Sequence, residues 1–443
     1  MEFAGLLLAL AIFASLPVCV WKPWIGMLIF LWISILTPQH LVGGFAYDFR
    51  FALVVSIATL AGVVLTRERS TLPRVPEVYL VGALWLVCLL STFFTAIHPD
   101  EAHVILVRVS KVFFMAGITL ILFRDRRKLR LLLLVVTGSI GVYGFAGGLF
   151  GIVTRGQEIL WGPPASILAD SNTLAFALTM VLPFLVFLRY DEDRPWVRHL
   201  LLTVYGLSIV AVLVTYSRAG MSVLLVVLGL IALRTFLRER KVAVVAVAAL
   251  SMVLFAPPRW QARVQTVRSL PKDGSVNKRA RSAYVAVRLG LDHPFLGAGF
   301  QPFSPDVYQH YIPGYSDYHN AHNHFLQLFA EHGFTGMLLF IAFLAALAMR
   351  LQRMKRLARG DPAQQWVLDY THAFEISLVA YILGGFALNR PYFEPFYQLA
   401  AAAVLLGELQ GDLLRSSPRA VDVGVAPGHQ PVAPLEDLRA NPV

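Results

Sequence analysis

The sequence predicts an all-α, polytopic membrane protein with twelve or thirteen transmembrane helices. Of its 443 residues, 57% are hydrophobic and only 15% are charged, whereas charged residues make up about 25% of a soluble domain. The mean hydropathy is +0.63, and apolar runs follow one another along most of the chain. Because about 20 apolar residues cross a bilayer as one helix, these runs predict membrane spans rather than a single buried core.

Thirteen apolar runs are candidate transmembrane helices. The second run is short, and the first two can pair as a hairpin that does not cross the membrane completely, which leaves twelve or thirteen spans. Strict alternation over thirteen spans puts the N-terminus outside, whereas twelve spans put both termini inside. The candidate helices cover residues 3–20, 24–37, 50–66, 77–97, 104–123, 131–153, 171–189, 200–216, 219–235, 241–256, 334–350, 368–388 and 395–410.

Lysine and arginine residues gather at every second connection between these runs. Short cytoplasmic connections of membrane proteins carry an excess of such residues, so we assign the basic clusters to the cytoplasm. The clusters lie within residues 67–74, 124–130, 189–198, 234–241 and 350–359. The other connections then face the opposite side, at residues 38–49, 98–103, 154–170, near Arg218, 257–333 and 389–394.

One connection on the outer side is far longer than the others. Residues 257–333 separate two apolar runs, and loops of that length are uncommon unless they have a function. The patterns at 279–291 and 323–332 are helical, so we predict a helical cap on the outer membrane surface. The predicted domains are an N-terminal transmembrane bundle (1–256), a large periplasmic loop (257–333), C-terminal transmembrane helices (334–410) and a disordered cytoplasmic tail (411–443).

Positive charge accumulates in the first half of this outer loop. Between residues 257 and 290 the sequence has a single acid, Asp273, against a series of basic residues. One interpretation is a solvated surface that meets anionic lipid headgroups. The other is a site for a polyanion, most naturally a diphosphate, because a planar guanidinium group binds phosphate oxygens two at a time. The basic residues are Arg259, Arg263, Arg268, Lys272, Lys278, Arg279, Arg281 and Arg288.

Three short polar segments on the same outer side interrupt the apolar pattern. Arg218 lies in a tight turn between two apolar runs, where it either extends to the membrane interface or marks the path of a ligand. Residues 170–172 (Asp-Ser-Asn) precede an apolar run, which predicts a helix cap. Arg390 and Glu394 in the last outer turn are candidates for an ion pair with each other.

Histidines cluster in the second half of the outer loop. Metal binding is disfavoured because nearby carboxylates are sparse, the two cysteines lie in distant apolar runs, and the spacing matches no zinc motif. A histidine that acts as a general base or orients a hydroxyl needs no metal, and for any single one of them a surface position is the simpler interpretation. The histidines are His310, His319, His322, His324 and His332.

Four landmarks in this half of the chain follow one another in a familiar order. His322-Asn323, nine residues, and Gly333-Phe334-Thr335-Gly336 fit the pattern H-[NSQ]-x9-G-x-x-[GTY]. The segment 292–300 (DHPFLGAGF), the helix start 170–175 (DSNTLA) and the turn Ser217-Arg218 match the other three. In these features the sequence resembles the O-antigen ligase and O-antigen polymerase superfamily, over roughly residues 165–340.

Within that superfamily the sequence is most similar to the O-antigen ligases, and residues 36–41 (LTPQHL) resemble ligases associated with exosortase systems. The resemblance implies a GT-C-like fold, commonly of twelve spans, with the active site in a large periplasmic loop. It also implies metal-independent glycosyl transfer without a cofactor. We expect direct attack on one donor, which inverts the configuration at the anomeric carbon.

The resemblance assigns roles to individual residues. His322 matches the essential histidine of the superfamily, and Arg218 matches the arginine of the SR turn. Arg279 matches a further arginine by its distance of fifteen residues before Pro294, with Arg281 as a rival for that place. We expect His322, Arg218 and Arg279 to be catalytic, whereas the expected substrate-binding residues are Arg281, Arg288, Asn323, His319 and Arg390.

The function implied is completion of lipopolysaccharide at the periplasmic face of the bacterial cell inner membrane. The expected donor is a glycan on undecaprenyl diphosphate, the acceptor is lipid A–core, and the other partners are inner-membrane lipids, with no nucleic acid. An O-antigen polymerase and a protein O-glycosylation ligase stay open as alternatives. A transporter of lipid-linked glycans is disfavoured, because the mid-span sequences are almost free of charge apart from Arg108 and Lys111.

Overall fold

A computed structural model describes residues 2–66, 68–236, 274–315 and 317–416. Its regular structure in those ranges is helical, with no β-strand among them. The predicted helix at 241–256, the first part of the predicted outer loop and most of the predicted tail lie outside the described residues. Within the described ranges, each of the other predicted apolar runs forms a helix.

Ten of the described α-helices, one of them the short α3, precede residues 237–273, which lie outside the described residues. They are α1 (Glu2–Trp21), α2 (Pro23–Leu36), α3 (Pro38–Val42), α4 (Phe51–Leu65), α5 (Pro76–Phe94), α6 (Pro99–Leu122), α7 (Arg126–Val153), α8 (Ser171–Phe187), α9 (Pro195–Val214) and α10 (Arg218–Thr235). After the gap come α13 (Gly274–Asp292), α14 (Pro305–Tyr311), α15 (His324–Ala358), α16 (Gln365–Gly385) and α17 (Glu394–Ser416).

Eight of the described helices are long and apolar enough to cross a membrane, by length and composition. They are α1, α5, α6, α7, α8 with the turn that follows it, α9, α10 and α15. The chain is therefore a multi-pass helical membrane protein. The second helix, α2, has 14 residues, or about 21 Å at 1.5 Å per residue, which is shorter than a bilayer core and fits the predicted short run.

Helix α8 forms the centre of the bundle. Of its spanning segment, 94% is buried, compared with 22% for α1 at the periphery. It packs against α7, α9, α10 and α16, and its residues are apolar around the whole circumference. A helix with apolar residues on all sides is stable only inside a bundle or in lipid, so this packing fixes the position of its first residues, which reach the site described below.

Helix α15 is broken near its start, between a short first segment and the long apolar part. His332 has φ −133° and ψ 15°, and Gly333 has φ 63° and ψ −164°, so neither is helical. A Cβ on Gly333 would lie 2.4 Å from the carbonyl oxygen of Pro294, which explains why glycine occupies the break. The sequence predicted a membrane helix from residue 334 and a separate helical stretch at 323–332. The structure joins these two stretches across the break.

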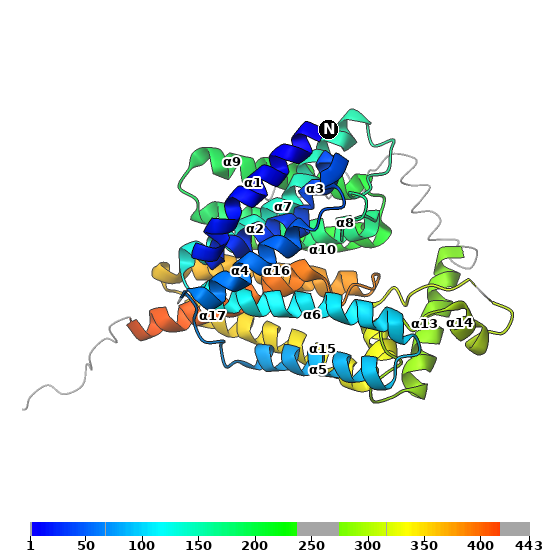
Figure 1. Ribbon diagram of the computed structural model, residues 1–443. Helices are drawn as coiled ribbons and strands as arrows, with labels where there is room; N and C mark the ends of the chain where they lie inside the picture. The colour runs from blue at the N-terminus through cyan, green and yellow to red at the C-terminus, as the bar shows by residue number, and fades with distance from the viewer. Residues whose placement is uncertain (1, 67, 237–273, 316, 417–443) are drawn as a thin grey trace, which may run out of the picture.

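A cap of residues 274–315 and 317–323, built on α13 and α14, lies at one end of the bundle (Figure 1). Helix α13 packs against α15, which confirms that the segment 279–291 is helical. Side chains from α13, α14 and the first segment of α15 form a small core of their own under the cap. The C-terminal end of α17 lies at the opposite end of the bundle in Figure 1.

Ion pairs concentrate at the end of the bundle opposite the cap. Arg350, near the end of α15, bonds Glu77 at the start of α5 through Nε at 2.7 Å. Lys355 bonds Glu375 at 2.8 Å. Three further pairs join the ends of the same bundle: Arg126–Asp191, Arg130–Glu192 and Arg234–Glu375. The basic residues of these pairs come from the clusters that the sequence assigned to the cytoplasm, and the structure places them together at this end of the bundle.

Candidate functional site

His322 occupies a strained turn immediately before α15. Its φ is 49°, a left-handed conformation that costs a residue other than glycine about 1–2 kcal/mol. The next residue, Asn323, caps the helix, and its Oδ1 accepts from Phe325 N at 2.9 Å and from Leu326 N at 3.1 Å. The turn therefore holds the half-buried His322 side chain at the junction between the cap and the bundle.

Helices α8 and α10 begin close to this turn. Asp170 caps α8 by accepting from Thr173 N at 2.9 Å, which confirms the predicted helix cap. Ser217 caps α10 by accepting from Gly220 N at 3.0 Å, and its hydroxyl also donates to Asn172 at 2.7 Å. The negative charge of Asp170 is close enough to act on the imidazole of His322. Helix N-termini carry partial positive charge, so their convergence favours an anionic ligand.

The electrostatic surroundings of His322 favour its neutral form. Burial lowers the pKa of this imidazole from the ordinary 6.5, and the nearby positive charges of Arg279 and His319 lower the pKa further. The carboxylate of Asp170 acts in the opposite direction. A neutral imidazole can accept a proton, which a protonated one cannot.

The three candidate arginines of α13 have different surroundings. Arg279 lies close enough to His322 to affect its pKa. Arg281 instead stacks over the ring of Tyr315, with 4.2 Å between its Cζ and the ring centroid. Arg288 follows nine residues after Arg279, about 13.5 Å along the helix axis, near Tyr311 at the far side of the cap. Of the three, Arg279 is the one that the structure brings to His322.

Arg390 and Arg218 approach the site from the bundle. Arg390, in the turn between α16 and α17, bonds Asp170 with 3.4 Å between Nη2 and Oδ2. The predicted pairing of Arg390 with Glu394 is wrong, since Glu394 accepts from Ser34 at 2.7 Å instead. Arg218 is the first residue of α10 and follows the cap residue that bonds the start of α8. Residues far apart in the sequence thus meet around Asp170.

His319 belongs to a polar group within the cap. Its Nε2 lies 3.3 Å from Asp317 Oδ1, and Lys278 Nζ lies 2.8 Å from the same carboxylate. The hydroxyl of Tyr308 donates to the backbone oxygen of His319 at 2.7 Å. The hydrogen bond from Lys278 keeps the pKa of Asp317 below its ordinary value. These contacts tie the loop before His322 to the start of α13.

The remaining histidines of the cluster do not gather around His322. His310 is exposed on α14. His324 is buried beneath the site against Tyr381, with 5.0 Å between ring centroids, and His332 is fully buried at the break in α15. Among the residues that the structure describes, no three His, Cys, Asp or Glu side chains lie close enough together to hold a metal ion.

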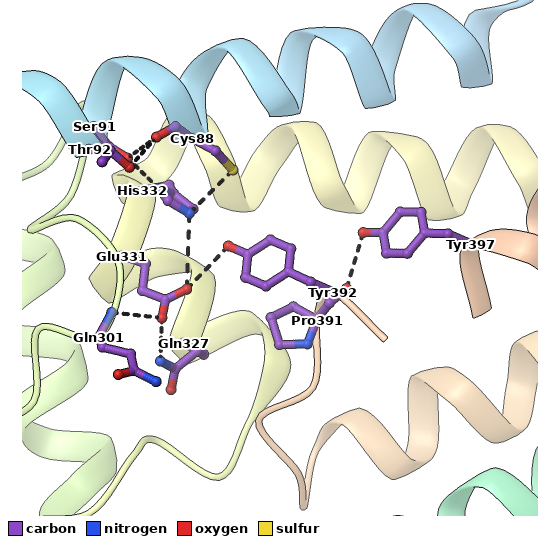
Figure 2. A network of polar contacts seen from close by, with 10 residues as sticks. All are labelled: Cys88, Ser91, Thr92, Gln301, Gln327, Glu331, His332, Pro391, Tyr392 and Tyr397. Carbon is purple, nitrogen blue, oxygen red and sulfur yellow. Dashed lines mark hydrogen bonds and ion pairs between the residues drawn. The ribbon is translucent and has the colours of Figure 1, made fainter. Parts of the chain in front are cut away.

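A buried polar network below the site has no counterpart in the sequence prediction (Figure 2). Glu331 accepts from Gln327 Nε2 at 2.7 Å and from Tyr392 Oη at 3.2 Å. Next to it, His332 contacts Ser91 Oγ at 2.6 Å and Cys88 Sγ at 3.4 Å. The sequence signal for this network is the adjacent pair Glu331-His332, which stands just before an apolar run.

An apolar cavity lies on the other side of this network. Its volume is about 830 Å³, and it is lined by residues of α5, α6, α15 and α17. Phe113 in its wall packs against Tyr392 with 6.3 Å between ring centroids, so cavity and network share a boundary. The glycines Gly82 and Gly117 also line it, and a Cβ added to either would meet no atom within 4 Å.

The site as a whole can bind an anion and accept a proton beside it. Guanidinium groups and helix N-termini supply positive charge that phosphate oxygens favour. The imidazole of His322 stands next to that charge in a form able to act as a base.

Comparisons with known proteins agree with this geometry. Residues 203–341 match the protein family described as O-antigen ligase, and residues 3–192 match a family of unknown function, DUF5935. No curated protein matches the chain. The first match includes the turn at Arg218, helix α13, His322 and the break at Gly333. Over residues 203–341 the chain is therefore similar to the O-antigen ligase family.

Proposed function

We propose that this protein transfers a glycan from a polyprenyl diphosphate to a hydroxyl group at the periplasmic face of the inner membrane. In the most specific form, O-antigen polysaccharide leaves undecaprenyl diphosphate and joins lipid A–core, which completes lipopolysaccharide. The observation that carries the proposal is the position of His322. It combines a strained turn, the nearby charge of Arg279 and the adjoining start of α8 with a family match over the same residues.

Arg279 and Arg218 bind the diphosphate in this mechanism. As the bond between the anomeric carbon and the diphosphate oxygen breaks, negative charge grows on the leaving group. Cations placed there stabilise the transition state more than the ground state, which accelerates the reaction. Arg390 is held at the same place by Asp170 and is a further ligand for the leaving group or the donor sugar. Arg281, Arg288, Asn323 and His319 have structural contacts, and their role in substrate binding stays a prediction.

His322 acts on the acceptor. Its neutral imidazole takes the proton of the acceptor hydroxyl while the oxygen forms a bond to the anomeric carbon from the face opposite the diphosphate. Attack on a single donor in this way inverts the configuration at that carbon. The energy stored in the diphosphate linkage drives the reaction, so we propose no nucleotide, cofactor or metal.

The apolar cavity supports substrates with long hydrocarbon chains. Its lining comes from membrane helices, and it borders the network beneath the site. A polyprenyl chain in this cavity would lie within the membrane while its diphosphate reaches the cap end of the bundle. Because lipid tails are as apolar as this lining, such a chain would be held in the cavity by packing contacts rather than by the hydrophobic effect.

The test uses purified protein in lipid nanodiscs with undecaprenyl diphosphate-linked glycan and lipid A–core. We expect the wild-type protein to extend lipid A–core, with the activity retained in a strong chelator. We expect His322→Ala to lower the rate by about 10²–10⁴-fold, the usual contribution of general-base catalysis, while the protein stays monodisperse. Mass analysis of the products measures both results.

The same product analysis separates the alternatives. Extension of the lipid-linked glycan itself would identify a polymerase, and transfer to an added protein acceptor would identify a protein O-glycosylation ligase. Wild-type transfer by His322→Ala would remove His322 from the mechanism. Activity that is lost in chelator and restored by a divalent cation would contradict the metal-independent reaction.

A further inference from the structure

The turns that follow His322 contain a buried amide and a buried carboxylate that no step of the proposed transfer uses. Gln327 is 4% exposed and Glu331 is 3% exposed. They are four residues apart in the first segment of α15, so they share one face of the helix, and Gln327 Nε2 donates to Glu331 Oε1 at 2.7 Å. Buried polar groups of this kind are stable only when they are hydrogen-bonded, so their partners show what they hold.

Gln327 holds the residue immediately before His322. Its Oε1 accepts a hydrogen bond from the backbone N–H of Ala321 at 3.2 Å. His322 then adopts its left-handed conformation, which persists only where neighbouring contacts determine the backbone. On the other side of the turn, the Asn323 cap supplies the second fixed point. The turn is thus fixed on both sides of the histidine.

Glu331 connects Gln327 to two other parts of the chain (Figure 2). Its Oε1 also accepts from the backbone N–H of Gln301 in the cap, at 3.3 Å. Its Oε2 accepts from the hydroxyl of Tyr392, in the turn between α16 and α17, at 3.2 Å. The carboxylate therefore fixes the Gln327 side chain relative to both the cap and the bundle.

The break in α15 adds backbone contacts to the same place. Ala298 N donates to Ala330 O at 2.9 Å, and Gly299 N donates to Glu331 O at 3.0 Å. A Cβ on Gly297 would lie 2.3 Å from the backbone of Glu331, so the segment packs against the helix backbone itself. Glu331 thus lies where backbone contacts join the segment 297–299 to α15, about two helical turns from His322.

From these contacts we propose that Gln327 and Glu331 are positioning residues for His322. Hydrogen bonds through this pair connect the break in α15 to the turn that carries the histidine. The pair holds this turn through the backbone of Ala321 and does not act on the substrate. The inference rests on the proposed function, in which His322 accepts the acceptor proton. It predicts that loss of the amide affects turnover more than binding of the donor.

The experiment compares variants of the full chain by kcat, KM for the donor, and the yield of monodisperse protein. We expect Gln327→Met to lower kcat at least tenfold while KM changes less than threefold, because the arginines stay in place. Glu331→Gln keeps an oxygen for Gln327 and Gln301 and an amide that donates to the Tyr392 hydroxyl. We therefore expect it to stay within threefold of the wild-type kcat.

A matched control lies on the same helix. Gln352 donates to Glu375 at 3.0 Å in an exposed pair near the other end of α15, and we expect Gln352→Met to have wild-type kcat and KM. Gln327→Asn serves as a second variant that keeps an amide but is too short to reach both partners. If both Gln327 variants fail to fold while Gln352→Met folds, the amide holds the fold and the inference is overturned.

Two further results would also overturn it. One is a wild-type kcat per folded molecule in Gln327→Met, and the other is equal damage from Glu331→Gln and Gln327→Met, which would make the carboxylate charge the important property. These results are distinct from failure of the proposed function, which is measured in His322→Ala alone. An inactive His322→Ala beside a fully active Gln327→Met contradicts the positioning role and leaves the transfer mechanism intact.

Discussion

At the scale of single residues, the site depends on how His322 is surrounded rather than on the histidine alone. Burial and the charges of Arg279 and His319 lower its pKa, while Asp170 raises it. The imidazole is therefore neutral at physiological pH and ready to accept a proton. In the proposed mechanism the guanidinium of Arg279 also stabilises the departing diphosphate, so one residue would contribute to both halves of the reaction.

The pH dependence of transfer follows from this pKa shift. Protonated His322 cannot act as a base, so kcat/KM falls as the pH drops through its pKa, which lies below the ordinary 6.5. We expect a rate that is constant around neutral pH and halves only below pH 6.5. His319→Asn removes one of the charges that lower the pKa, so it should move this acidic limb to higher pH. A wild-type midpoint above 6.5 would contradict the assignment.

The two arginines near the start of α13 provide a matched pair. Lysine lacks the planar fork that binds two phosphate oxygens, so we expect Arg279→Lys to lower kcat at least tenfold. Arg281 stacks on Tyr315, and a lysine can keep a cation–π contact there, so Arg281→Lys should stay within threefold of wild type. Steady-state kinetics with lipid-linked donor measures both. The reverse order of damage would transfer the phosphate-binding role to Arg281.

At the scale of helices, the break at residues 332–333 joins the cap to the bundle. Backbone atoms of the segment 294–299 contact the helix directly, and Phe334 N donates to Pro294 O at 2.8 Å. Glycines at 297 and 333 permit this close approach because side chains there would overlap backbone atoms. The glycines of the two sequence motifs therefore have a structural explanation that is independent of substrate.

A comparison of alanine substitutions at Gly333 and Gly314 distinguishes the cost of steric overlap from the cost of backbone strain. Both have positive φ, 63° and 81°, but a Cβ at Gly314 would meet no atom within 4 Å. We expect Gly314→Ala to cost about 1 kcal/mol of stability, the price of the left-handed conformation alone. Gly333→Ala should cost at least about 2 kcal/mol more, because overlap with the Pro294 carbonyl is added. Thermal unfolding in detergent measures the difference, and equal effects would show that the break tolerates a side chain.

At the scale of the whole molecule, the bundle places a charged site at one end and acid–base pairs at the other, with an apolar cavity between α5 and α6. This arrangement suits two amphiphilic substrates that meet within the membrane plane. It also explains why charge is scarce in the middle of the helices, because each buried charge there would be costly.

Filling the cavity tests the proposed hydrocarbon site. Gly117 lines the cavity and has open space at its Cβ position, so Gly117→Trp should occupy the cavity without disturbing its neighbours. Exclusion of the chain removes its packing contacts with the cavity wall, so we expect KM for a long-chain donor to rise, with a smaller rise for a short-chain analogue. Gly138→Trp on α7, which also has open space, is the control. Equal effects on both chain lengths would exclude the cavity as the chain site.

The sequence was sufficient to predict most of the helices, but not which residues meet at the candidate site. Apolar runs predicted helices with ends close to the observed ones, as for 219–235 against Arg218–Thr235. The bond between Asp170 and Arg390 joins residues 220 positions apart, and the network around Glu331 also depends on tertiary packing. Local patterns carry no information on such pairs. The number of spans beyond the eight qualifying helices in the described residues also stays a prediction.

The short first segment of α15 gives the spacing in the sequence motif a geometric meaning. From His324 to Glu331 it makes about two helical turns, anchored at both ends. One inserted residue would rotate the histidine by about 100° and raise it by about 1.5 Å. The nine-residue interval therefore sets both the height and the orientation of the imidazole relative to the break in α15.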